Sequence, residues 1–236
     1  MDDSETLIGE YLRHQGHTNV VYEPDGNQPP DLLVNGRIAV EVRRLNQNEE
    51  PPGGSPRGLE ETGIPLNAAV RKVLASMGPP TDGVSWFVSY RFRRPPLPRK
   101  EFERRLKQTL ANLVAAGIPD AAEVNVAPGF RIDVRRASKL HPTRFLLGAS
   151  VDHDTGGFVV AELVRNLSIC VAEKTRKVAP FLSKYPEWWL AFVDRIAYGS
   201  LDSEDLKQLR AAFTQAGIWD RIILVAPTDP KRGFSL

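Results

Sequence analysis

The stretch PDLLVNGRIAVEVR, residues 30–43, decides the fold that we expect for the first part of the chain. Two apolar runs in it flank Asn35-Gly36, a pair that favours a tight turn because both residues tolerate positive φ angles. We therefore expect two strands, residues 31–34 and 38–45, joined as an antiparallel hairpin. Such a hairpin brings the ends of the stretch together.

The hairpin carries two carboxylates and one basic residue. Alternation along the second strand places Glu41 and Arg43 on one face, and Val40 and Val42 on the other. Asp31 opens the first strand, so the pairing brings Asp31 and Glu41 to the same end of the same face. Paired carboxylates form a hard oxygen site suited to Mg²⁺ or Mn²⁺, which can hold a phosphate oxygen and deliver a water.

The composition is that of an ordinary globular protein. The chain has 236 residues, of which 42% are hydrophobic and 25% charged, enough to bury a substantial core. Helical and strand patterns interleave throughout, which predicts a single α/β domain over 1–236: a mixed central sheet with helices on both faces. Residues 46–58 hold almost no apolar side chains and many turn formers, so we expect a flexible surface loop there.

The sequence predicts no membrane helix, no secretory signal and no cysteine-based zinc cluster. No apolar run approaches the roughly 18 residues of a membrane helix, and the acidic start MDDSET lacks the order of a secretory signal. We therefore expect no membrane association and a cytoplasmic location. Cys170 is the only cysteine, which excludes an internal disulfide and a cysteine-based zinc cluster.

The segment resembles the active-site segment of the PD-(D/E)xK nuclease superfamily. The resemblance consists of Pro30-Asp31, a hairpin, and then Glu41-Val42-Arg43, within a motif segment of residues 1–45. In that family a helix precedes three antiparallel strands, and a further helix and strand follow them. The resemblance implies a restriction-endonuclease-like core and a Mg²⁺- or Mn²⁺-dependent nuclease that hydrolyses phosphodiester bonds in DNA, with Asp31 and Glu41 holding the metal.

A third carboxylate is expected from the preceding helix. Many family members carry a glutamate early in that helix, some eleven residues before the glycine that ends it, and Glu5 and Gly16 repeat this spacing. Helical periodicity puts Glu5 on the same face as Ile8 and Leu12, which turns it inward. Glu5 is therefore expected in an outer position of the catalytic site.

Arg43 departs from the family pattern, in which lysine is usual. An arginine stays protonated and cannot act as a general base, although it can stabilise a developing anion. Either Arg43 only stabilises charge, or the role of the lysine has moved elsewhere. Lys174 is one possible donor, because it falls on the apolar stripe of a long helix, and Lys177, one turn on, would extend the basic edge.

Basic side chains are clustered although the net charge is only +2. Clustering of this kind suits phosphate binding, whereas a solvated helix face is the simpler interpretation. The side chains that we expect to track a DNA backbone are Arg93, Arg94, Arg99, Lys100, Arg104, Arg105 and Lys177.

Two other functions stay open. The arginine at position 43 permits a catalytically inactive relative that keeps the fold and binds nucleic acid or a protein partner. A plain α/β interaction protein would show neither metal nor nucleic-acid binding. A homodimer is plausible for an enzyme that cuts a duplex.

Overall fold

The chain folds into two compact units. The computed structural model describes residues 2–50, 53–214 and 217–236. Unit 1 comprises residues 1–57 and 157–236, and unit 2 comprises residues 58–156, so unit 2 is an insertion in the sequence of unit 1. Each unit has its own hydrophobic core, whereas the sequence predicts a single domain over 1–236.

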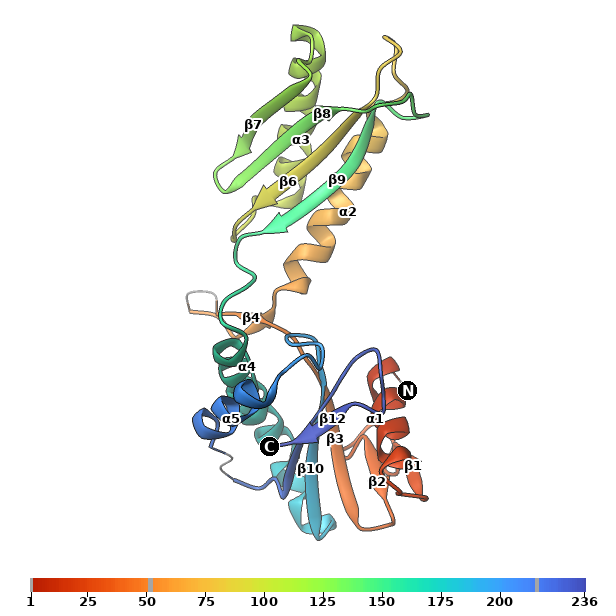
Figure 1. The fold of residues 1–236 in the computed structure, drawn as a ribbon, viewed down its shortest axis with the longest axis vertical. Helices are drawn as coiled ribbons and strands as arrows, with labels where there is room; N and C mark the ends of the chain where they lie inside the picture. The colour runs from red at the N-terminus through yellow and green to blue at the C-terminus, as the bar shows by residue number, and fades with distance from the viewer. Residues whose placement is uncertain (1, 51–52, 215–216) are drawn as a thin grey trace. The chain divides into compact units, whose positions relative to one another are not determined.

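Unit 1 is built around a six-stranded mixed sheet (Figure 1). Its strands in spatial order are β1 (Val20–Tyr22), β2 (Leu32–Val34), β3 (Ile38–Leu45), β10 (Glu187–Asp194), β11 (Arg221–Val225) and β12 (Gly233–Ser235). The strands β1, β2 and β3 pair antiparallel, and so do β11 and β12. The central strand β10 runs parallel to both β3 and β11.

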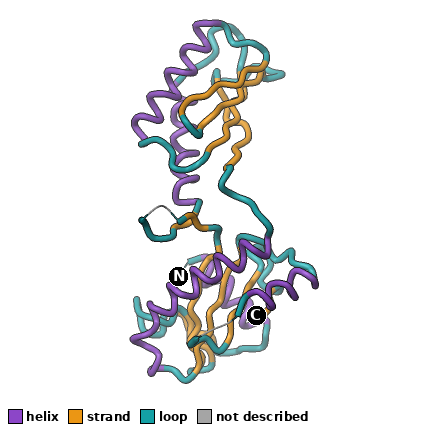
Figure 2. The backbone as a smooth tube through the Cα atoms, turned by 90° about the vertical axis from the view of Figure 1, so that its left-hand side faces the viewer, coloured by secondary structure: helices purple, strands orange, loops and turns teal. Residues whose placement is uncertain are grey.

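Helices cover both faces of this sheet, as expected from the sequence. On one face α1 (Asp3–His14) packs through Ile8 and Leu12. On the other lie α4 (Val159–Val178) and α5 (Ser203–Ala212), with the 3₁₀ helix η1 (Ala179–Lys184) following α4. Figure 2 shows the strands of unit 1 with helices on either side. Successive residues of β3 face opposite sides of the sheet: Val40 and Val42 pack with α1, and Ala39 packs with α4. Glu41 therefore lies on the side that faces α4.

The hairpin predicted around Asn35-Gly36 is confirmed. Asn35 and Gly36 have φ angles of 52° and 70°, so both lie in the left-handed region. Val34 and Ile38 are direct partners across the two strands. This register, continued by one residue beyond β2, sets Asp31 opposite Glu41.

Within the loop expected at 46–58, two short strands form. They are β4 (Asn48–Glu49) and β5 (Arg57–Gly58), which pair with each other. Residues 51–52 lie outside the described part of the chain. The pairing gives part of this segment regular structure where the sequence predicts only a loop. No helix in the described part of the chain is long and apolar enough to cross a bilayer.

Unit 2 is a four-stranded sheet with two helices on one face (Figure 1). Its elements are α2 (Glu60–Ser76), β6 (Trp86–Phe92), α3 (Arg99–Ala116), β7 (Ala121–Ala127), β8 (Phe130–Arg136) and β9 (Phe145–Asp152). The strand order is β7-β8-β6-β9. Residues such as Val88 and Ile132 join both helices in one core, whereas the alternating side chains Phe87, Arg91 and Arg135 belong to the other face.

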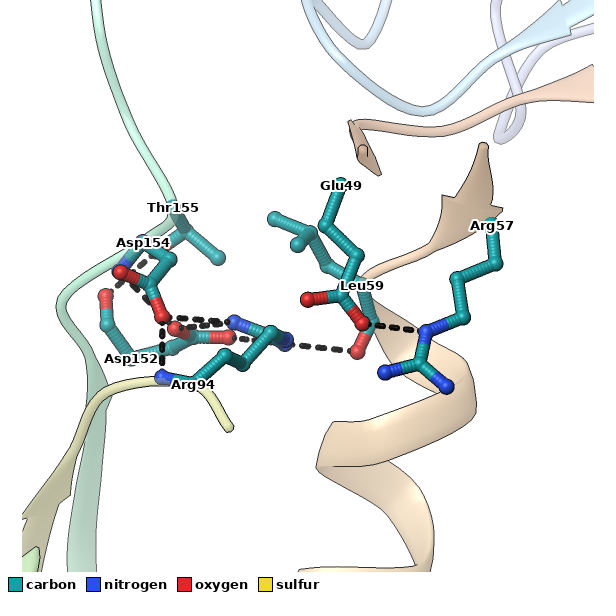
Figure 3. Close-up of polar contacts among 7 residues, drawn as sticks. All are labelled: Glu49, Arg57, Leu59, Arg94, Asp152, Asp154 and Thr155. Atoms are coloured by element: carbon teal, nitrogen blue, oxygen red, sulfur yellow. Dashed lines mark hydrogen bonds and ion pairs between the residues drawn. The ribbon is translucent and has the colours of Figure 1, made fainter. Parts of the chain in front are cut away.

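A buried arginine joins the end of β6 to the end of β9. The Arg94 side chain is only 6% exposed, and its Nη1 and Nη2 each lie 2.7 Å from a carboxylate oxygen of Asp152. Asp154 lies 3.3 Å from Nη1, and Nη2 donates to the Leu59 carbonyl at 2.7 Å. Figure 3 shows this bidentate arrangement and also draws the Glu49–Arg57 pair of unit 1. Arg94, expected to contact DNA, is occupied in holding unit 2 together.

Arg94→Ala should destabilise unit 2 by about 3 to 5 kcal/mol, because it leaves two partly buried carboxylates without their counter-charge. The exposed pair between Arg57 and Glu49 offers a matched control, and Arg57→Ala should cost about 1 kcal/mol or less. Urea denaturation combined with hydrogen exchange of the β6 and β9 amides measures both effects. Equal small losses in the two variants would contradict the structural role of Arg94.

Candidate active site

Three elements of unit 1 bring two carboxylates and two lysines together. Asp31 precedes β2, Glu41 lies in the middle of β3, and Lys174 and Lys177 project from α4 one turn apart. The Val42 amide donates to Asp31 Oδ2 at 2.7 Å, which fixes the Asp31 carboxylate beside β3. The cluster therefore depends on the hairpin and on the packing of α4 against it.

Each lysine bridges both carboxylates. Lys174 Nζ lies 2.6 Å from Glu41 Oε2 and 3.5 Å from Asp31 Oδ2. Lys177 Nζ lies 3.0 Å from the same Glu41 oxygen and 3.8 Å from Asp31 Oδ1. A single cation can thus contact Asp31 and Glu41 at once, which is the geometry that a shared metal ion would also require.

Burial makes this pairing necessary. The Glu41 side chain is fully buried and that of Lys174 is 11% exposed, whereas Lys177 is 47% exposed. An unpaired charge at the position of Glu41 would cost several kcal/mol, so its compensation by cations is required for folding. Burial alone would lower the pKa of Lys177, but the hydrogen bond that Lys177 donates to Glu41 and the charges of Glu41 and Asp31 raise it overall.

One carboxylate oxygen is left over. Glu41 Oε1 is buried and has no hydrogen-bond partner among the described residues. A buried acceptor without a partner is costly, and a second carboxylate lies beside it, so the residues fit a divalent cation. No group of three or more His, Cys, Asp or Glu side chains suited to a metal occurs in the described ranges. Two carboxylates suit Mg²⁺, which usually keeps several waters and takes further oxygens from substrate phosphates.

Arg43 lies two residues beyond Glu41 but is engaged by a helix residue. Its Nη1 lies 2.5 Å from Glu173 Oε1. Burial would lower the pKa of Arg43, yet the Glu173 contact raises it, with a smaller contribution from Cys170. Of the two possibilities raised by the sequence, the structure places a lysine, Lys174, at the carboxylates and pairs Arg43 with an acid.

Glu5 is not brought to this cluster. It accepts the Asp2 amide at 3.0 Å and completes a capping box with Asp2 at the start of α1. Helix α1 packs on the sheet face opposite to Glu41, and no hydrogen bond or ion pair joins Glu5 to Asp31 or Glu41 in the described residues. The inward orientation predicted from periodicity gives way to a local cap. The pattern Asp-x-x-Glu at residues 2–5 is the sequence signal that indicates this cap.

The predicted DNA-binding side chains on α3 divide into two groups. Arg99 and Arg105 are held by glutamates four residues away, Glu103 and Glu101, at 3.0 and 2.6 Å. Lys100 and Arg104 are exposed on α3, and no ion pair engages them in the described part of the chain. Only the second group retains an uncompensated positive charge on the surface.

A second polar contact, which the sequence does not predict, joins the turn that precedes Asp31 to the segment that follows α4. Asp25 Oδ2 accepts hydrogen bonds from Tyr185 Oη at 2.8 Å and from Lys184 Nζ at 2.6 Å. Asp25 lies in the turn before Asp31. Tyr185 comes directly after η1, which itself follows α4 in the sequence. The hydrogen bonds from Lys184 and Tyr185 lower the pKa of Asp25. Partial burial and the bond to Asp25 raise the pKa of Tyr185 to about 12.

Comparisons of this chain with protein families, with curated proteins and with solved structures return no match.

Lys174→Met should destabilise unit 1 by on the order of 3 kcal/mol, because it removes the closest counter-charge of a fully buried carboxylate. Lys177→Met should cost about 1 kcal/mol or less, because Lys177 is half exposed. Urea denaturation of the two isosteric variants tests the difference. Equal costs would show that the two lysines share the burial of Glu41 evenly, against this assignment.

Tyr185→Phe should change how stability depends on alkaline pH. Since the folded state raises the pKa of Tyr185 from 10.0 to about 12, its contribution is complete below pH 10 and is lost as the pH rises towards 12. The difference in unfolding free energy between wild type and Tyr185→Phe should therefore shrink over that interval. Urea denaturation at a series of pH values measures it, and a constant difference would contradict the hydrogen bond to Asp25.

Proposed function

We propose that this protein is a metal-dependent nuclease that hydrolyses phosphodiester bonds in DNA. The observation that carries the proposal is the position of Lys174 Nζ, 2.6 Å from Glu41 and 3.5 Å from Asp31. It supports the idea that the lysine missing at position 43 is supplied by α4. The two carboxylates and this lysine then form the set that the PD-(D/E)xK motif requires.

The order of elements supports the same proposal. When unit 2 is treated as an insertion and the short strand β4 and the 3₁₀ helix η1 are left aside, unit 1 runs α1, β1, β2, β3, α4, β10. This is the helix, three antiparallel strands, helix and strand of the nuclease family. The long interval between the third strand and the second helix, which departs from the family order in the sequence, is then accounted for by an inserted unit. A restriction-endonuclease-like core is thus part of the proposal.

The residues take distinct roles in it. Asp31 and Glu41, including the unpaired Glu41 Oε1, would hold a divalent cation that polarises a phosphate oxygen and lowers the pKa of a bound water. Lys174 Nζ lies next to Glu41 and would stabilise the negative charge that develops on a phosphate bound at this site. Lys177, the more exposed lysine, is the one free to move aside for the cation and to contact the substrate. Lys100 and Arg104 would contact the DNA backbone.

A second candidate is a catalytically inactive nucleic-acid-binding relative. The observation that favours it is charge balance, because two lysines already neutralise the two carboxylates without a metal. Arg43 is likewise neutralised by Glu173. In this case the cluster only stabilises the fold, and nucleic-acid binding depends on exposed basic residues.

Asp31→Asn should abolish Mg²⁺ or Mn²⁺ binding and DNA cleavage together, because it removes half of the metal-holding charge. Isothermal titration with each metal and an assay on plasmid and branched DNA give the two readouts. Glu10→Gln, which neutralises an exposed carboxylate of α1, is the matched control and should retain both activities.

Cleavage that persists in purified Asp31→Asn would refute the proposed site. Absence of metal binding and cleavage in the wild type, together with salt-sensitive DNA binding in EDTA, would favour the inactive relative instead.

A further inference from the structure

A basic cavity lies at one end of the unit 2 sheet and is unrelated to the carboxylate cluster of unit 1. Its volume is about 340 Å³, and Arg91, Arg93, Asn125, Arg131 and His153 are among the residues that line it. Three arginines and a histidine around one hollow give a surface rich in hydrogen-bond donors. A ligand can use these charges only where no carboxylate of the protein already neutralises them.

Two of the arginines are held in place by carboxylates that are not among the lining residues. Arg91 makes a bidentate contact with Asp133 at 2.9 and 3.2 Å, and Arg131 contacts Glu123 and also Asn125 at 3.1 Å. Neither Asp133 nor Glu123 is among the lining residues. The acids thus fix the direction of the guanidinium groups. Donors fixed in this way lose less conformational entropy when an anion binds.

The third arginine is exposed and keeps its charge. Arg93 is engaged in no ion pair in the described part of the chain. Its backbone is nevertheless fixed, because its amide donates to the Gly129 carbonyl at 2.8 Å. On the next strand the His153 amide donates to the Phe92 carbonyl at 2.9 Å, and the buried Arg94 pairs with Asp152 and Asp154 on either side of His153. Arg93 and His153 are therefore presented to the cavity by rigid strand ends.

We propose that this cavity binds a phosphate of a nucleic-acid backbone. The planar fork of Arg93 matches a pair of phosphate oxygens, and Arg93 supplies the net positive charge that its neutralised neighbours lack. The nature of the ligand rests on the proposed nuclease function, because a protein that acts on DNA needs phosphate contacts away from the cleaved bond. Arg93 is one of the DNA-binding residues expected from the sequence. The proposal adds Arg91, Arg131 and His153, which line the same cavity, to that set.

Fluorescence anisotropy with a labelled DNA oligonucleotide and the full chain in EDTA tests this site without hydrolysis. Arg93→Ala should weaken binding about fivefold and lower the slope of log affinity against log salt by about one. Arg93→Lys, which keeps the charge but loses the planar fork, should bind more weakly than wild type and more tightly than Arg93→Ala. Arg71→Ala removes the same charge from an exposed position of α2 and should leave the affinity unchanged.

Equal affinities for Arg93→Ala and Arg71→Ala would overturn the proposal, because the effect would then be one of net charge. Binding of inorganic phosphate that Arg93→Ala abolishes, with DNA affinity unaltered, would also overturn it and assign the cavity to a free anion. The outcome is independent of the catalytic test. A DNA-binding loss in Arg93→Ala supports the cavity even if the wild type cleaves no DNA, and unchanged binding refutes it even if cleavage requires Asp31.

Discussion

The burial of Glu41 is the constraint on which the structure of unit 1 depends. A carboxylate with no exposed surface must be paired, and here the partners come from one helix, α4. Lys174 and Lys177 meet Glu41, while Glu173 on the same helix meets Arg43. Apolar residues of α4 such as Leu163 and Leu167 are buried in the core on this face of the sheet, but apolar contacts are non-directional and do not specify one alignment. The ion pairs fix the register of α4 against β3.

Much of the site could be predicted because its determinants are local. The period of two along β3 places Glu41 and Arg43 on one face, and the helical period of α4 places Lys174 on the side that packs against the sheet. Asn35-Gly36 fixes the turn, and with it the alignment of Asp31 with Glu41. These features need only geometry within a single element or a single hairpin. The structure has all of them as expected.

What the sequence could not predict depends on contacts between distant segments. The parallel pairing of β3 with β10 joins residues roughly 150 positions apart, and no local pattern specifies it. The same holds for the insertion of unit 2, since its alternating strands and helices resemble a continuation of one sheet. Glu5 lies apart from the cluster for a different reason, because its carboxylate takes part in a capping interaction with Asp2, three residues away. Arg94 likewise has an ordinary basic context in the sequence, and only the fold reveals the two aspartates that surround it.

The carboxylate cluster is also an inefficient way to stabilise a fold. Apolar residues of similar volume in place of a buried ion network often give an equal or greater stability, and the network here leaves one acceptor, Glu41 Oε1, without a partner in the described residues. A purely structural cluster would gain from satisfying that oxygen. Proteins tolerate such costs mainly at functional sites, where an unsatisfied group is completed by a ligand. The leftover oxygen, together with a half-exposed lysine that could move, therefore weighs in favour of a cation-binding role over a structural one for Asp31 and Glu41.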